Sequence, residues 1–190
     1  MKNLEGGIVV AFGAVIILKM LQIQGAGLLT LMVLSLISVF FVAGSWRLFL
    51  PKTPEKDHKV IALITGIAFS IATIAILFKV QVWPGTQGML SIALTGIGIA
   101  AITTLVYFLS FRSTSQSPFY KQMLSRILIV AILTSVFYFV PTRSLIKIYH
   151  RGDREYVRLF MQAHDNPQNE SFQQELMQYR KSKRQAESND

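Results

Sequence analysis

The chain alternates long apolar blocks with short polar segments. The blocks cover residues 6–21, 28–49, 60–80, 89–111 and 127–140. Each block is apolar on nearly all sides of a helix, which is typical of helices in contact with lipid, and none shows the alternation of a membrane-barrel strand. A helix needs about 20 apolar residues to cross the hydrocarbon core. The pattern therefore predicts an all-α integral membrane protein.

The polar segments divide the chain into hairpins and connectors. A first transmembrane hairpin covers residues 1–50 and a second covers 60–111, with connectors at 51–59 and 112–126. A fifth transmembrane helix is predicted within 127–148, followed by a soluble, basic, helical tail at 149–190. The fifth block is short and stops at Pro141, although the long side chains of Arg126 and Arg143 can lengthen its effective span by snorkelling. An interfacial or re-entrant helix is the open alternative.

The two hairpins form a weak internal repeat of 60 residues. The coincident positions are Gly6 and Gly66, Ile16 and Ile76, Lys19 and Lys79, and Gly25 and Gly85. In both copies a lysine near the end of an apolar helix precedes a glycine by six residues, and a second apolar block follows. Because an even number of spans separates equivalent points, the copies are expected to be parallel.

The hairpin turns carry residues suited to the membrane interface. The residues concerned are Lys19, Gly25, Lys79, Trp83, Pro84 and Gly85. A lysine can keep its stem in the apolar zone while its ammonium reaches water or headgroups, and tryptophan suits the same level. Proline and glycine end a helix and permit a tight reversal. Anchoring of the hairpin tip is the simplest interpretation, and the alternative is that the lysines face the other hairpin or bind an anionic headgroup or a partner.

Small residues four apart indicate where helices can approach closely. The pairs are Gly66 with Ser70, Ser91 with Thr95, and Gly96 with Ala100. Such pairs are common in membrane helices, so they predict close packing without naming the partner helix.

The net charge of +9 is carried mainly by the connectors and the tail. Basic loops mark the cytoplasmic side of a membrane protein, so both connectors and the N-terminus are predicted to be cytoplasmic, and nucleic-acid binding is not expected. Five spans then place the tail on the side of the membrane opposite the cytoplasm. The basic residues that follow the last block favour the opposite side, so the side of the tail depends on whether that block spans.

The tail contains two short amphipathic stripes. Tyr156, Leu159 and Phe160 share one helical face, and Phe172, Leu176 and Tyr179 share another at spacings of four and three. The six residues either dock a partner or pack on each other or on the bilayer surface. The end of the tail, residues 180–190, is predicted to be disordered.

The sequence gives no indication of chemistry. None of the acidic residues and none of the histidines lies inside a predicted span, and there is no cysteine. No zinc-protease, serine-hydrolase or phosphate-loop motif is present, so no catalytic residue, cofactor or metal site is predicted. The expected role is a non-enzymatic scaffold or accessory subunit that contacts lipid and a protein partner or a second copy. A small transporter or channel built on parallel repeats is the alternative, and an intramembrane enzyme is less favoured.

One stretch resembles a known family. Leu77, Phe78 and Lys79 end a helix before a turn that contains glycine, and the segment from Met89 to Ile92 opens the next helix. This resembles the membrane hairpin of the L subunit (GldL-like) of the gliding-motility and type IX secretion motor of Bacteroidetes. The resemblance implies a helical hairpin in a bacterial inner membrane. The family carries a glutamate in its second helix, whereas residues 95–100 here contain no acid, so motor activity is not implied.

Overall fold

The computed structural model describes residues 2–21, 23, 25–50, 56–111, 117–166 and 168–188. These residues form helices and no strands. The helices are α1 (Lys2–Met20), α2 (Ala26–Ala43), α3 (Ser45–Phe49), α4 (Lys56–Gln81), α5 (Thr86–Ser110), α6 (Ser117–Phe139), α7 (Thr142–Tyr149), α8 (Arg154–Asp165) and α9 (Glu170–Ser188). The chain divides into two compact units, Met1–Val140 and Pro141–Asp190, and each is described by itself.

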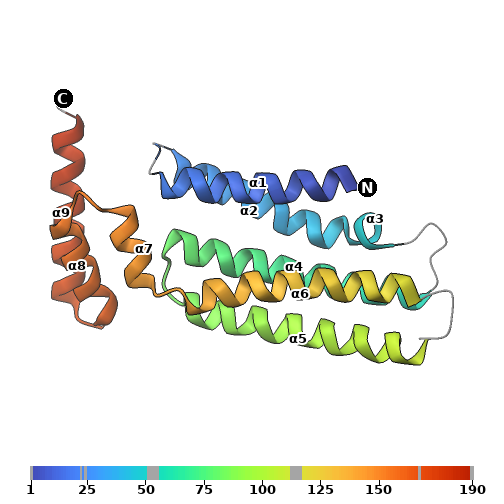
Figure 1. Ribbon diagram of the computed structural model, residues 1–190. Coiled ribbons are helices and arrows are strands. Elements are labelled where there is room, and N and C mark those ends of the chain that lie inside the picture. Colours follow the sequence, from blue (N-terminus) through green and yellow to red (C-terminus); the bar gives the residue numbers. More distant parts are fainter. Residues whose placement is uncertain are drawn as a thin grey trace. The chain divides into compact units, whose positions relative to one another are not determined.

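The first unit is a bundle in which the long helices α1, α2, α4, α5 and α6 run side by side (Figure 1). Each contacts the next along the chain, and α4 contacts α6 as well as α2 and α5. The apolar window of α4 is 67% buried, compared with 28% for α2, 22% for α5 and 17% for α6. Helix α4 is therefore the central helix, and the other helices present broad apolar faces outward.

Four helices are long and apolar enough to cross a membrane: α2, α4, α5 and α6. The apolar part of α1, Gly6–Met20, is shorter. The described residues therefore confirm the all-helical fold, and four helices that could span a membrane are compatible with the predicted membrane protein. The short apolar helix is thus α1. The fifth block, which was expected to be the short one, is part of a 23-residue helix.

Helix α6 has bounds different from those predicted. It begins at Ser117, inside the segment predicted as a connector, because Tyr120 and Met123 are buried there and hold the polar segment in the bundle. It ends at Phe139, and α7 is a separate helix, because Pro141 interrupts the backbone hydrogen bonding. The helix predicted at 127–148 is thus shifted toward the N-terminus.

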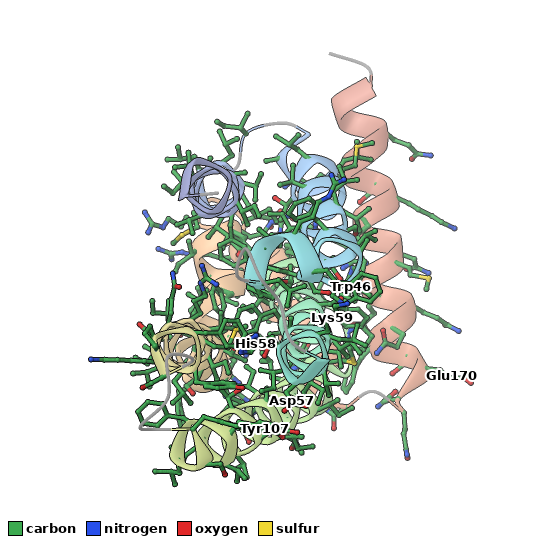
Figure 2. All side chains as sticks on the ribbon, turned by 90° about the vertical axis from the view of Figure 1, so that its right-hand side faces the viewer. Trp46, Asp57, His58, Lys59, Tyr107 and Glu170 are labelled. Carbon is green, nitrogen blue, oxygen red and sulfur yellow. The ribbon has the colours of Figure 1, made fainter. Side chains whose placement is uncertain are left out.

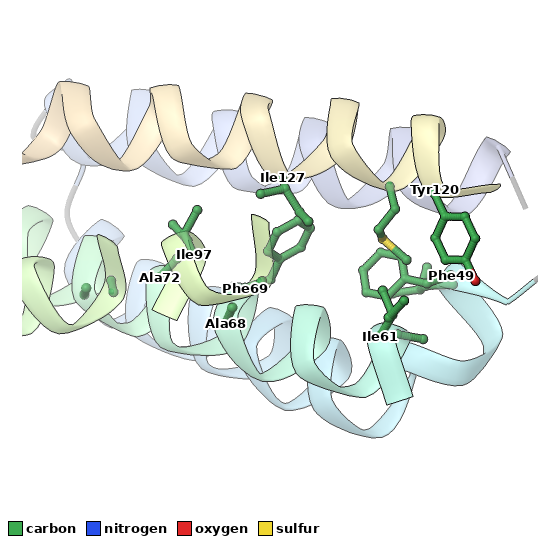
Figure 3. Packing of buried hydrophobic residues seen from close by; sticks show 14 of the residues in the cluster. Phe49, Ile61, Ala68, Phe69, Ala72, Ile97, Tyr120 and Ile127 are labelled. Carbon is green, nitrogen blue, oxygen red and sulfur yellow. The ribbon is translucent and has the colours of Figure 1, made fainter. Parts of the chain in front are cut away.

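The core of the bundle is built where α4 meets its neighbours (Figure 3). Phe69 of α4 packs its ring edge against Phe41 at 5.6 Å and Phe49 at 5.7 Å between centroids. Ala68 and Ala72 of α4 are almost fully buried, and their small side chains allow neighbouring helices to approach α4 closely. Alternation of rings and alanines on one helix lets three neighbours pack against it.

The second unit consists of α7, α8 and α9. Helices α8 and α9 pack on each other around Leu159, Ala163 and Leu176. Helix α9 continues to Ser188, through most of the segment predicted to be disordered. Lysine, arginine, glutamine, alanine and glutamate are good helix formers, and the predicted disorder underestimated this local preference.

Candidate functional site

The two hairpin turns have the same backbone geometry 60 residues apart. Gly25 has φ +83° and Gly85 has φ +77°, and a helix begins at the next residue in both cases. Only glycine adopts this left-handed conformation without strain. The backbone N–H of the residue four positions after each glycine donates to the glycine carbonyl at 3.1 Å in both turns. The glycines predicted to turn the chain therefore occupy equivalent places.

The end of the first helix is closed in the same way in both hairpins. The N–H of Ile23 donates to the carbonyl of Leu18 at 3.4 Å, and the N–H of Trp83 donates to the carbonyl of Phe78 at 3.0 Å. These bonds have the six-to-one pattern that ends many helices. Trp83 also places its ring edge-on to Phe78, with centroids 4.9 Å apart, and remains 38% exposed. Pro84, beside it, is exposed.

The two lysines at these turns lie in different environments. Lys79 is only 2% exposed, which differs from the snorkelling lysine predicted at the interface. The reason is the central position of α4, since neighbouring helices enclose its last turn. Lys19 is half-buried, and its Nζ lies 3.1 Å from the place where a Cβ on Gly27 would be. The Nε2 of Gln81 donates to the carbonyl of Gly27 at 2.6 Å. The first turn and the end of α4 thus meet at Gly27.

The predicted pair Gly66 and Ser70 lies where α4 contacts α2. A Cβ on Gly66 would stand 2.5 Å from the backbone oxygen of Phe41 and 2.6 Å from the Cβ of Ser45. The hydroxyl oxygens of Ser38 and Ser70 are 2.7 Å apart. Only a residue without a side chain allows α4 to come this close, and the serine pair satisfies two buried hydroxyls one turn away.

The predicted small residues of α5 lie on two different faces. Ala100 is 1% exposed, and Gly96 faces α4, with the Cβ of Ala68 4.0 Å from its virtual Cβ. Ser91 and Thr95 are exposed and donate to carbonyls of their own helix, at 3.0 and 2.9 Å. The structure therefore brings Gly96 and Ala100 to the α4–α5 contact but leaves the Ser91 and Thr95 pair on the outside of the bundle.

The six stripe residues of the tail meet each other in one cluster. Leu159 and Leu176 are 6% and 5% exposed, and the four aromatic residues pack around them. The aromatic residues are Tyr156, Phe160, Phe172 and Tyr179. The sequence left open whether these residues dock a partner or pack on each other. In the structure α8 packs on α9, so most of these side chains contact each other within the unit.

Asp153 organises the second unit, and it was not singled out by the sequence. Its carboxylate accepts from the N–H of Tyr156 at 2.9 Å, from the hydroxyl of Tyr179 at 2.8 Å and from Nζ of Lys183 at 2.6 Å. Partial burial alone would raise the pKa of Asp153, but these three hydrogen bonds outweigh it and lower the pKa to about 2. The signal for a helix cap was present, since an aspartate directly precedes the amphipathic run. No local pattern pointed to Lys183.

An aromatic cluster at the other end of the bundle was also missed. His58, in the first turns of α4, is 3% exposed and lies 4.4 Å from Phe119 and 5.5 Å from Tyr120 between ring centroids. Tyr120 is fully buried and packs on Tyr107 and Phe111 at 6.1 Å. Figure 2 views this end, with His58 and Tyr107 on neighbouring helices. The ring contacts pack the starts of α4 and α6 against the end of α5.

Within the described residues, no three histidine or acidic side chains gather as a metal-binding group. Comparison with protein-family models, with characterised proteins and with solved structures gives no match to this chain. The functional argument therefore depends on the geometry alone.

Proposed function

We propose that this chain is a multi-pass protein of a bacterial inner membrane and acts as a non-enzymatic scaffold or accessory subunit of a membrane complex. The observation that carries the proposal is the division into an apolar helical bundle and a separately packed soluble unit that begins directly after α6. The bundle supplies the anchor, and the soluble unit supplies a charged surface of fixed shape for a protein partner or a second copy.

The polar groups inside the bundle support a structural role. The hydroxyls of Thr73, Thr104 and Thr134 donate to carbonyls four residues earlier in their own helices, at 2.8, 2.7 and 2.8 Å. Groups bonded to their own backbone do not line a path for an ion or substrate. The carboxylate of Asp57 lies in the first turn of α4, at the edge of the apolar part. A proton-coupled transporter generally carries an ionisable group deeper in its spans.

The length of α6 supports the predicted orientation. If α2, α4, α5 and α6 all cross, the end of α2 and the end of α5 share one side, and the soluble unit shares the other side with the turns at Gly25 and Gly85. This holds whether or not α1 crosses, since α1 lies before the first of these spans. The basic connectors assign their own side to the cytoplasm, so the soluble unit is periplasmic.

The matching turns support an origin of the two hairpins from one repeated unit. The second hairpin also carries the resemblance to the motor L-subunit family, and we propose that this resemblance extends to the hairpin fold and the membrane only. In the region where the family has its glutamate, the hydroxyl of Thr95 is exposed and donates to the carbonyl of Ser91. Proton-driven motor activity is therefore not part of the proposal.

The test is photo-crosslinking of the full chain in its native membrane. A photoreactive residue in place of Met177, which is 60% exposed on α9, is expected to give a discrete crosslinked species. The same residue in place of Leu176, which is 5% exposed, is the matched control and is expected to give none. If exposed positions of the soluble unit give no crosslinked species, and the purified chain in proteoliposomes supports a substrate-dependent flux, the transporter or channel interpretation replaces the scaffold.

A further inference from the structure

Five basic side chains follow soon after the end of α6, two of them on helix α7 and three after it. Residues 141–158 contain five bases and two acids, a net charge of +3. The bases are Arg143, Lys147, Arg151, Arg154 and Arg158. The excess of basic over acidic side chains makes this segment attractive to an anionic partner.

The described ion pairs of this segment involve only two of its five bases. Arg158 pairs with Glu155, and Arg143 pairs with Asp165 at 2.6 Å. The other acid, Asp153, is held by Lys183 from α9. In the ion pairs found among the described residues, Lys147, Arg151 and Arg154 take no part, and all three are exposed.

The connection to α6 places the start of α7 near the bilayer surface, and Lys147, Arg151 and Arg154 follow on α7 or soon after it. Only Val140 and Pro141 separate the end of α6 from the start of α7. A chain advances at most about 3.5 Å per residue, so α7 starts within roughly 10 Å of the end of the span. This distance is comparable to the range over which a charge acts at physiological salt. Helix α7 lies at the bilayer surface only if α6 crosses the membrane, as proposed above.

Helix α7 is also strongly amphipathic. Its buried residues are Leu145, Ile146 and Tyr149, whereas Arg143 and Lys147 are on the exposed side. The apolar side of α7 is therefore occupied within the protein, and the basic side is the one left to meet anionic headgroups at a membrane interface. Juxtamembrane clusters of bases on the cytoplasmic side of a span bind acidic lipids, and the same charge attraction acts at any leaflet that contains acidic phospholipid.

We infer that Lys147, Arg151 and Arg154 form a binding surface for anionic phospholipid headgroups, which holds the start of the soluble unit against the bilayer. The ligand is the phosphate of an acidic lipid in the leaflet that α6 reaches. Each base near an anionic surface adds about a 5-fold gain in association, so the three together give a contact that is strong in an acidic bilayer and weak in a neutral one.

The chain has no cysteine, which makes a single labelled position straightforward. Ser144→Cys, at an exposed site of α7, carries an environment-sensitive fluorophore on the full chain in vesicles of phosphatidylcholine with increasing phosphatidylglycerol. The fluorescence is expected to change as phosphatidylglycerol rises, and high salt is expected to reverse the change. At a fixed phosphatidylglycerol fraction, Lys147→Gln is expected to lower the ratio of docked to undocked chain by about 5-fold. Lys181→Gln, an equal charge change at an exposed site of α9, is the control and is expected to leave it unchanged.

A second label separates this inference from its premise. Leu128 is 60% exposed in the middle of α6, so the fluorophore on Leu128→Cys reports a bilayer interior if α6 spans. If the Leu128 label reports water, the membrane assignment of α6 fails. If it reports lipid but the Ser144 label ignores phosphatidylglycerol, or if Lys147→Gln and Lys181→Gln act alike, the headgroup surface is refuted and the bases serve an acidic protein surface instead.

Discussion

The hydroxyl oxygens of Ser38 and Ser70 lie 2.7 Å apart in the contact between α2 and α4. Ser38 is 4% exposed and Ser70 is 7% exposed, so neither hydroxyl has ready access to water, and each is a hydrogen-bond partner of the other. This bond joins the first hairpin to the second across their adjoining helices. Hydrogen bonds between membrane helices are weaker than their burial implies, because the separated helices find other partners.

A double-mutant cycle on Ser38→Ala and Ser70→Ala measures this bond. The coupling free energy is expected to be about 0.6 kcal/mol, the average for such pairs in a membrane protein. The measurement is the free energy of unfolding of the full chain in mild detergent for the wild type, both single variants and the double variant. Additive losses from the two single variants would show that the hydroxyls do not bond to each other.

Gly66→Ala is expected to separate α2 from α4. The added Cβ meets the backbone oxygen of Phe41 at 2.5 Å, and backbone atoms cannot rotate away as a side chain can. Overpacking of this kind costs about 1–3 kcal/mol. Thermal unfolding in detergent measures the loss. Gly98→Ala is the control, because a Cβ there has nothing within 4 Å, and it is expected to be neutral or to stabilise α5.

Gly25→Ala and Gly85→Ala are expected to destabilise the chain by similar amounts, about 1 kcal/mol each, because alanine is strained in the left-handed conformation. No atom lies within 4 Å of the virtual Cβ at either position, so the cost comes from the backbone alone. Gly88→Ala, in α5 and also with open space, is the control. Turn variants with the same midpoint as Gly88→Ala would contradict the backbone strain, and turn variants with midpoints that differ from each other would contradict the equivalence of the two turns.

Sequence patterns predicted the helices of the bundle because each apolar block is a continuous run long enough to form most of one helix. The turns were predicted for a related reason, since glycine at Gly25 and Gly85 satisfies a local backbone requirement. The sequence left open whether Lys79 lies at the membrane interface or faces the other hairpin. Its burial could not be predicted, because it depends on the central position of α4, which no local pattern encodes. The same holds for Lys183, which reaches Asp153 only after α8 and α9 pack. The bounds of α6 were missed because tertiary burial of Tyr120 overrides the polarity of its neighbours.

The stability of the second unit is expected to fall in acid through Asp153. Its pKa is about 2 in the folded chain and about 3.9 in an unfolded one, so the ionised carboxylate favours the folded state. This contribution is present above about pH 4 and is lost as the pH falls toward 2. Because Lys183 is partly exposed, we discount the effect for solvent screening to about 1 kcal/mol.

The hydrogen-exchange protection of the Tyr156 amide, corrected for the intrinsic rate, measures this loss in the full chain. Protection is expected to fall about 5-fold between pH 4 and pH 2, and Asp153→Asn is expected to be low and flat over the same range. Asp165→Asn is the control, because the pair with Arg143 is exposed on both sides and contributes little. A wild-type profile as flat as that of Asp153→Asn would refute the role of the carboxylate.

The side of the soluble unit is decided by α6. A dual reporter fused after Asp190, active on one side of the membrane only, is expected to show the periplasmic state, because α6 is a 23-residue apolar helix and the connector before it is proposed to be cytoplasmic. A control fusion after Phe111, at the end of α5, is expected to show the cytoplasmic state. The two fusions have opposite outcomes only if α6 crosses. Equal outcomes would make α6 interfacial, place the basic tail with the basic connectors, and leave the membrane anchor to the earlier helices.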